Sequence, residues 1–191
     1  MKRISILPAL FILITIGCRK SNSPTNQLPP ETHDGDNTMG CYVDTKLFIP
    51  QEPFLSNLGG YSGAAILNAP SFDLVLNWTD DISNSDFTSV SIQLDSVQLI
   101  QGATYTLGAP PDSMTDQTSH KVWATYINWV QYQFYYTAGE GTGQVTIDYY
   151  DPTVSVATGI VSGHFSFDAV NSNNDTVHVS EGRFDMALQM R

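Results

Sequence analysis

Basic side chains are scarce in this sequence of 191 residues. Eight Lys and Arg stand against 19 Asp and Glu, which gives a formal net charge of −11. A chain this acidic lacks the positive surface that binds the phosphate backbone of nucleic acid, and an anionic lipid surface repels it. We therefore expect no nucleic-acid partner. Charged residues amount to 14% and apolar residues to 41%, a composition too apolar for a disordered chain.

Cysteine is also rare. The chain has two cysteines, Cys18 and Cys41, so it has no disulfide framework of the kind that holds small secreted domains together. A reactive thiol at Cys41 would need a supporting histidine, and none is near it in the sequence. We expect Cys41 to be a small buried hydrophobic residue.

No apolar run is long enough to cross a bilayer, which takes roughly 20 residues. The longest run, residues 4–16, follows Lys2 and Arg3, as in a secretory signal. It leads into Thr15-Ile16-Gly17-Cys18, which resembles a bacterial lipobox with Thr where Leu is usual. We predict that residues 1–17 are a lipoprotein signal peptide and that Cys18 is the lipidation site. The alternative is an ordinary signal peptide followed by a chance cysteine.

Residues 19–38 are poor in apolar side chains, with no aromatic residue and a single aliphatic one, Leu28. Such a segment cannot bury enough apolar surface to offset the entropy lost on ordering. The sequence therefore predicts three parts: the signal peptide, a lipidated Cys with a flexible tether at 18–38, and one domain at 39–191. The acyl chains would attach the protein to a membrane.

From residue 40 onward the apolar pattern alternates and is rich in Val, Ile, Thr, Phe and Tyr, which is typical of strands. We predict an all-β domain of roughly ten antiparallel strands, folded as a β-sandwich or, as the alternative, a β-barrel. A tight hairpin is expected at Asp44-Thr45. The predicted strands are 40–43, 46–49, 61–68, 72–79, 87–99, 103–107, 121–127, 130–137, 143–150, 159–170 and 176–190.

The last two strands allow a prediction of register. Odd-numbered residues are apolar in 159–170 and at Val177 and Val179, so the loop between these strands must contain three or five residues. From Phe184 onward the apolar residues are even-numbered. One extra residue causes such a change of phase, and Gly182 stands there, so we predict a β-bulge at Gly182.

Short motifs at both ends of the domain carry a resemblance to a family. Leu28-Pro29-Pro30-Glu31-Thr32 and Gly40-Cys41-Tyr42-Val43 stand near the start. Ile160-Val161-Ser162-Gly163-His164-Phe165-Ser166-Phe167 and Gly182-Arg183-Phe184-Asp185 stand near the end. Together they resemble a lipoprotein domain family of unknown function from Bacteroidota. In its first hairpin that family has Gly where Thr45 stands here. Residues 50–140 match the family only in their general strand pattern and not in specific motifs. The resemblance implies an all-β lipoprotein and no particular activity.

The resemblance also bears on the location of the protein. In that phylum, acidic residues soon after the lipidated cysteine favour export to the cell surface. The first acidic residue after Cys18 is Glu31. We therefore expect an outer-membrane lipoprotein, on the periplasmic face rather than the cell surface.

Signals for chemistry are weak, and we predict no catalytic residue, no metal ligand and no cofactor. Gly60-Tyr61-Ser62-Gly63-Ala64 departs from the nucleophile-elbow pattern at its last residue. His164 and His178 are expected on the outer face of the last two strands, where two imidazoles alone make a poor metal site. The acidic loops 34–37 and 80–86 lack the spacing of an EF-hand.

Aromatic residues are dense between residues 121 and 136. On an unbroken strand, Trp123, Trp129 and Tyr135 share a face with Thr125, Gln131 and Gln133. Rings mixed with amides are typical of carbohydrate-binding surfaces, so these three rings are candidate ligand-binding residues. Two alternatives remain: other parts of the fold cover the rings, or a break near Asn128 rearranges the faces.

A modification signal stands in a Pro-rich stretch. Asp112-Ser113-Met114 follows Pro110-Pro111 and matches a short O-glycosylation pattern of exported Bacteroidota proteins. Ser113 is therefore a candidate glycosylation site.

The leading functional hypothesis is a non-enzymatic, membrane-anchored envelope protein with a binding or structural role. Its expected partner is a polysaccharide or an envelope protein, with glycan binding as the sharpest form of the hypothesis. The alternative is a hydrolase acting on glycans through carboxylates such as Asp80, Asp81 and Asp86.

Overall fold

The computed structural model describes residues 27–50, 63–68, 73–79, 87–111, 121–139, 141–153 and 158–190. Every regular element within these ranges is a β-strand, which confirms the all-β prediction. The strands are β1 (Thr38–Val43), β2 (Lys46–Phe48), β3 (Gly63–Asn68), β4 (Asp73–Thr79), β5 (Thr88–Asp95), β6 (Thr104–Leu107), β7 (Lys121–Asn128), β8 (Gln133–Tyr136), β9 (Gly143–Asp151), β10 (Thr158–Val170) and β11 (Thr176–Met190).

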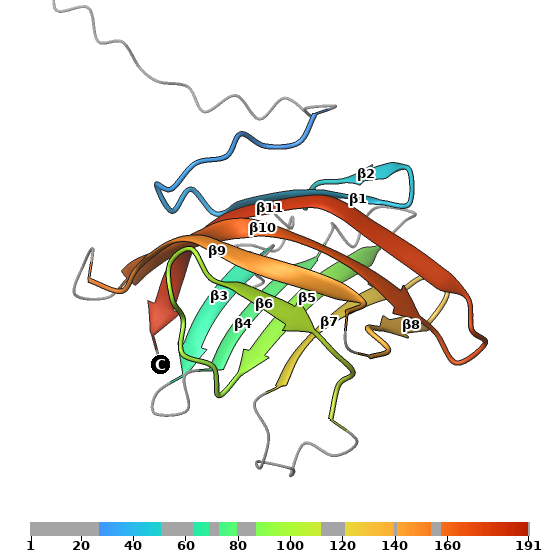
Figure 1. Ribbon diagram of the computed structural model, residues 1–191. Helices are drawn as coiled ribbons and strands as arrows, with labels where there is room; N and C mark the ends of the chain where they lie inside the picture. The colour runs from blue at the N-terminus through green and yellow to red at the C-terminus, as the bar shows by residue number, and fades with distance from the viewer. Residues whose placement is uncertain are drawn as a thin grey trace, which may run out of the picture.

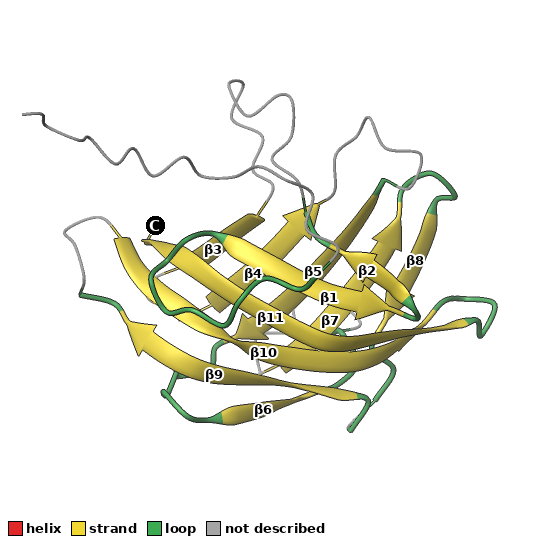
Figure 2. Cartoon of the chain, turned by 90° about the horizontal axis from the view of Figure 1, so that it is seen from above, coloured by secondary structure: helices red, strands yellow, loops and turns green. Residues whose placement is uncertain are grey.

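The strands form a two-layer sandwich (Figures 1 and 2). One layer contains β1, β9, β10 and β11, and the other contains β3, β4, β5 and β7. Strand β11 is long enough to reach both layers: it pairs with β1 and β10, and its last residues pair in parallel with β3. At the other end, a single residue pair, Val170 with Tyr136, joins β10 to β8 in the described chain. This contact of one residue pair does not close the strands into a barrel, and the fold is a sandwich of two layers.

The core lies between the two layers and is built from the inward-facing residues of each strand. The largest fully buried side chains are Ile92, Leu94, Leu107, Ile147, Met186, Leu188, Val90, Val145 and Val161. Cys41 is also fully buried, and its burial raises the pKa of the thiol. The thiol stays protonated, and the expectation of a buried hydrophobic cysteine is confirmed.

The predicted registers are confirmed. Val43 pairs with Lys46 across the two-residue turn Asp44-Thr45, and Asp44 has a φ of 53°. Val170 pairs with Thr176, so the loop between β10 and β11 has the odd length that the apolar pattern requires.

The β-bulge in β11 lies immediately before Gly182. Phe165 pairs with Gly182 and Phe167 pairs with Val179, so Ser180 and Glu181 together oppose Ser166. Glu181 has a φ of 50°, which absorbs the extra residue. A Cβ added at Gly182 would lie 2.5 Å from the ring of Phe165, which explains the glycine beside the bulge.

Residues 28–37, which we name the strap, lie along the outer face of β10 and β11 (Figure 1, blue). The composition of this segment predicts a flexible tether, and the structure differs for these residues. Gly35 packs against Ile160 of β10 and Ala187 of β11, and the Asn37 side chain accepts a hydrogen bond from the Ala187 amide at 3.0 Å. Hydrogen bonds to the sheet, which composition does not reveal, replace apolar burial here.

Candidate functional site

A turn over residues 129–132 breaks the aromatic segment into β7 and β8. Asn128 pairs with Gln133, and Tyr126 therefore pairs with Tyr135. A four-residue loop inverts the parity of the faces: odd positions in β7 lie beside even positions in β8. The predicted shared face of Trp123 and Tyr135 does not exist.

The three candidate rings are buried or half-buried. Trp123 is 8% exposed. Trp129 donates from Nε1 to Ser89 Oγ at 3.1 Å, and its ring packs against Phe87 and Phe134. Tyr135 packs beside Tyr126 against the core. The three rings therefore do not share one face, and their role in ligand binding stays a prediction.

The exposed rings of β8 lie on the face opposite to Tyr135. Phe134 pairs with Ile127 and Tyr136 pairs with Thr125, so these rings share the face of Trp123. Tyr132 is 78% exposed, Tyr136 40% and Phe134 39%. They border a groove of about 570 Å³, which we name the aromatic groove. Its lining residues are Tyr132, Gln133, Phe134, Tyr136, Val170, Asn171, Ser172 and Asn173. The sequence signal that could have identified this face is the turn after Asn128.

One wall of the aromatic groove is held by the side chain of Asn171. Its Oδ1 accepts hydrogen bonds from the amides of Asn173 and Asp175, both at 2.9 Å. Its Nδ2 donates to Asp175 Oδ2 at 2.9 Å. Asn171 therefore fixes the loop between β10 and β11, while Ser172 and Asn173 remain exposed at the groove.

The two histidines of the outer face bind aspartates rather than one another. His164 Nδ1 lies 2.8 Å from Asp148 Oδ2, and His178 Nδ1 lies 2.7 Å from Asp168 Oδ1. The hydrogen bond and the charge of Asp168 raise the pKa of His178. Within the described residues, no three His, Cys, Asp or Glu side chains are arranged to hold a metal ion.

The residues that carry the family resemblance come together under the strap. Asp185 Oδ2 accepts from Thr32 Oγ1 at 2.7 Å and from the Asp34 amide at 2.9 Å, and Oδ1 accepts from the Gly35 amide at 2.8 Å. His33 Nδ1 lies 2.6 Å from Ser162 Oγ. These motifs, far apart in the sequence, thus form one structural unit.

Pro29 completes the unit at the other end of the strap. A Cβ on Gly40 would lie 2.5 Å from Pro29 Cδ, so the glycine leaves room for the proline ring. Arg183 donates from Nη1 to the Pro29 carbonyl at 3.3 Å.

Several predicted positions lie outside the described residues. These are Cys18, Ser113 and the carboxylates Asp80, Asp81 and Asp86. No helix in the described part of the chain is long and apolar enough to span a membrane.

Comparison with known proteins gives one match. Residues 82–186 match the family model described as a domain of unknown function (DUF6252). The matched region contains the whole aromatic groove and excludes the strap. No curated protein and no solved structure matches the chain.

Proposed function

The chain belongs to the DUF6252 family, a domain of unknown function, and from that premise we propose that it is a lipid-anchored envelope protein whose β-domain binds a glycan. The observation that carries this proposal is the aromatic groove, in which Tyr132, Phe134 and Tyr136 present exposed rings beside polar loop residues. The domain acts by binding and catalyses no reaction.

The chemistry of the aromatic groove suits a sugar chain. Aromatic ring faces stack against the C–H faces of sugars, and amide and hydroxyl groups bond to sugar hydroxyls. Tyr132 and Phe134 supply the rings, and Ser172, Asn173 and Gln133 supply the polar groups. The Asn171 hydrogen bonds fix the loop before a ligand arrives, which lowers the entropy lost on binding.

The choice of binding over hydrolysis rests on the residues at the groove. Glycosidases of the usual kind place two carboxyl groups on either side of the scissile bond. The described lining of the aromatic groove has rings, amides and a hydroxyl but no carboxylate. The hydrolase alternative would need carboxylates of residues 80–86, which lie outside the described residues.

The attachment to the envelope rests on the signal sequence and Cys18. The chain from Cys18 to the strap at Leu28 can extend to about 35 Å at most. The strap is bonded to Asp185, so this short link would hold the sheet close to the membrane surface. We place the protein in the outer membrane, facing the periplasm rather than the cell exterior.

Affinity electrophoresis of the purified chain in gels containing soluble polysaccharides tests the proposal. We expect at least one polysaccharide to retard the protein, and Tyr132→Ala and Tyr136→Ala each to weaken binding about tenfold. Ile100→Ala removes a side chain of similar exposure outside the groove and serves as the control. Equal binding by wild type and both tyrosine variants would show that the aromatic groove is not the binding site. No retardation by any polysaccharide would refute glycan binding.

A further inference from the structure

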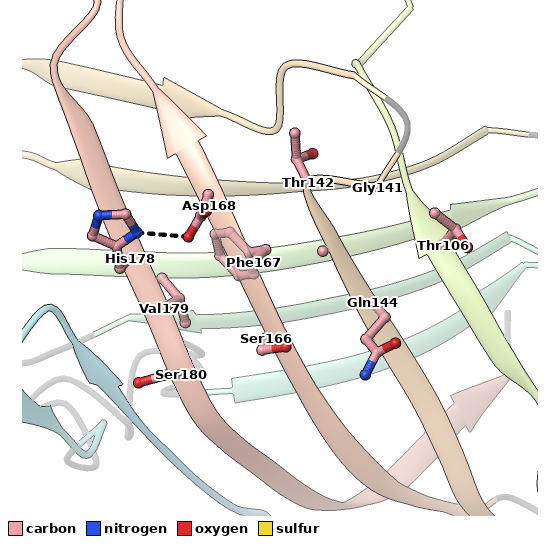
Figure 3. Close-up of a pocket in the computed structure, with 11 residues that line it drawn as sticks. Thr106, Gly141, Thr142, Gln144, Ser166, Phe167, Asp168, His178, Val179 and Ser180 are labelled. Atoms are coloured by element: carbon pink, nitrogen blue, oxygen red, sulfur yellow. Dashed lines mark hydrogen bonds and ion pairs between the residues drawn. The ribbon is translucent and has the colours of Figure 1, made fainter.

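A second hollow lies on the outer face of β6, β9, β10 and β11 (Figure 3). Its volume is about 490 Å³, and we name it the trough. A row of small polar side chains crosses the four strands along it: Thr106, Gln144, Ser166 and Ser180. Thr106 pairs with Gln144 and Gln144 pairs with Ser166, so these residues lie side by side in register.

The bulge supplies the last member of the row. Ser180 and Glu181 together oppose Ser166, so β11 bends at this level and Ser180 lines the trough. Three strand spacings separate β6 from β11, a span of about 14 Å. This span suits an extended ligand rather than a single small molecule.

The row differs from its neighbours in its hydrogen bonding. On one side, Thr104 Oγ1 bonds to Thr146 Oγ1 at 2.8 Å. On the other side, His178 bonds to Asp168, as the dashed line in Figure 3 marks. Across the described residues, the side chains of Thr106, Gln144, Ser166 and Ser180 form no side-chain hydrogen bond. Their hydroxyl and amide groups are therefore free to bond to a ligand.

Strand β10 lines both the trough and the aromatic groove. Ser166, Asp168 and Val170 alternate onto the same face of that strand, and Val170 lines the groove. From Ser166 to Val170 the distance along the strand is about 13 Å. A chain that stacks on Tyr136 can therefore reach the trough without leaving this face.

We propose that the trough binds further sugar units of the same glycan, which makes the ligand a neutral polysaccharide rather than a short or anionic sugar. This inference rests on the proposed glycan binding. The trough offers hydroxyl and amide partners for sugar hydroxyls. Its described lining contains no Lys or Arg, and its histidine, His178, is already paired with Asp168, so it offers no unbalanced positive charge to an anionic chain. The net charge of −11 disfavours anionic polymers further.

The test uses the purified chain with neutral probes (galactomannan, xyloglucan, mixed-linkage β-glucan and dextran) and with anionic polygalacturonate. From any neutral polymer that binds, a series from disaccharide to octasaccharide is titrated by calorimetry. Two double variants remove polar groups from the trough: Gln144→Ala/Ser166→Ala and Thr106→Ala/Ser180→Ala. The control is Thr104→Ala, because Thr104 lies outside the trough and bonds to Thr146. Thermal melts verify that each variant folds.

We expect affinity to rise with chain length in the wild type and in Thr104→Ala. Both trough variants should bind the shortest sugars like wild type but lose about tenfold on the longest. Tyr136→Ala should weaken binding at every length. If both trough variants keep the full gain with length, the trough proposal is overturned while glycan binding stands. Binding of polygalacturonate as tight as that of the neutral polymers overturns the neutral-chain assignment. If no probe binds the wild type, both proposals fail.

Discussion

The outer face of β10 and β11 is covered at one end and open at the other. At the covered end, Ser162 and Asp185 bond to the strap and are each 1% exposed. At the open end, Ser166 and Ser180 line the trough and bond to no side chain within the described residues. The same two strands thus present outward-facing polar residues at both ends. At the covered end, the strap supplies the hydrogen-bond partners of these residues.

This difference shows how the face can bind a chain. The strap is an extended segment. It is held by the Asp185 carboxylate and the Ser162 hydroxyl, and Gly40 leaves room for its Pro29 ring. It demonstrates that outward polar residues on this sheet can fix an extended chain. The open end has groups of the same kind without an occupant from the chain, and we therefore assign it to the ligand.

The largest difference between the two ends is expected when one outward carboxylate is removed from each. Asp185→Ala takes away the acceptor for Thr32 Oγ1 and for two strap amides, and we expect it to lower the free energy of unfolding by about 2–4 kcal/mol. Asp168→Ala, at the open end, should change it by no more than about 0.5 kcal/mol because the Asp168–His178 pair is exposed. Urea unfolding measures both, and equal losses would refute the distinction between the two ends.

A smaller effect is expected when the strap is displaced without touching its hydrogen-bond acceptor. In Gly40→Ala the new Cβ would meet the Pro29 ring at 2.5 Å, so the start of the strap must move. Overpacking of this kind typically costs about 1–3 kcal/mol, and limited proteolysis should cut the strap faster.

Gly139→Ala is the matched control for that variant, because a Cβ there meets no atom within 4 Å. Its unfolding free energy and its strap cleavage should equal those of wild type. Faster strap cleavage in Gly139→Ala, or no acceleration of cleavage in Gly40→Ala, would show that the close approach of Gly40 to Pro29 does not hold the strap in place.

At the open end, Tyr132→Ala should have almost no effect on stability. The ring is 78% exposed, so its loss should change the free energy of unfolding by no more than about 0.5 kcal/mol. The same variant should weaken glycan binding, as proposed above. A thermal melt beside a binding titration separates the two effects, and a large loss of stability would mean that the ring supports the fold.

Much of the fold could be predicted from the sequence because strand alternation is a local signal. The odd-to-even change of apolar phase before Phe184 marked the bulge to within a residue or two. The hairpin at Asp44-Thr45 followed from turn chemistry in the same way.

The aromatic face and the strap could not be predicted, for two different physical reasons. The four-residue turn after Asn128 inverts the parity of the following strand. A prediction that misses this turn therefore assigns every later ring to the wrong face. The strap is fixed by Asp185, more than a hundred residues away, and composition contains no information about such a partner. Long-range hydrogen bonds are visible only once the strands are placed.

The smallest predicted effect concerns His178 at the edge of the trough. Asp168 on β10, by its hydrogen bond and its charge, raises the pKa of His178 above its ordinary value of 6.5, and Asp44 in the first hairpin adds a smaller effect of the same sign. The protonated form is favoured in the folded chain, so the pair stabilises the fold below about pH 6.5. This contribution is lost as the pH rises through the raised pKa. An NMR titration of the imidazole should give a pKa above the ordinary value, and Asp168→Asn should lower it. A pKa that does not change in Asp168→Asn would show that the pair at the edge of the trough does not persist in solution.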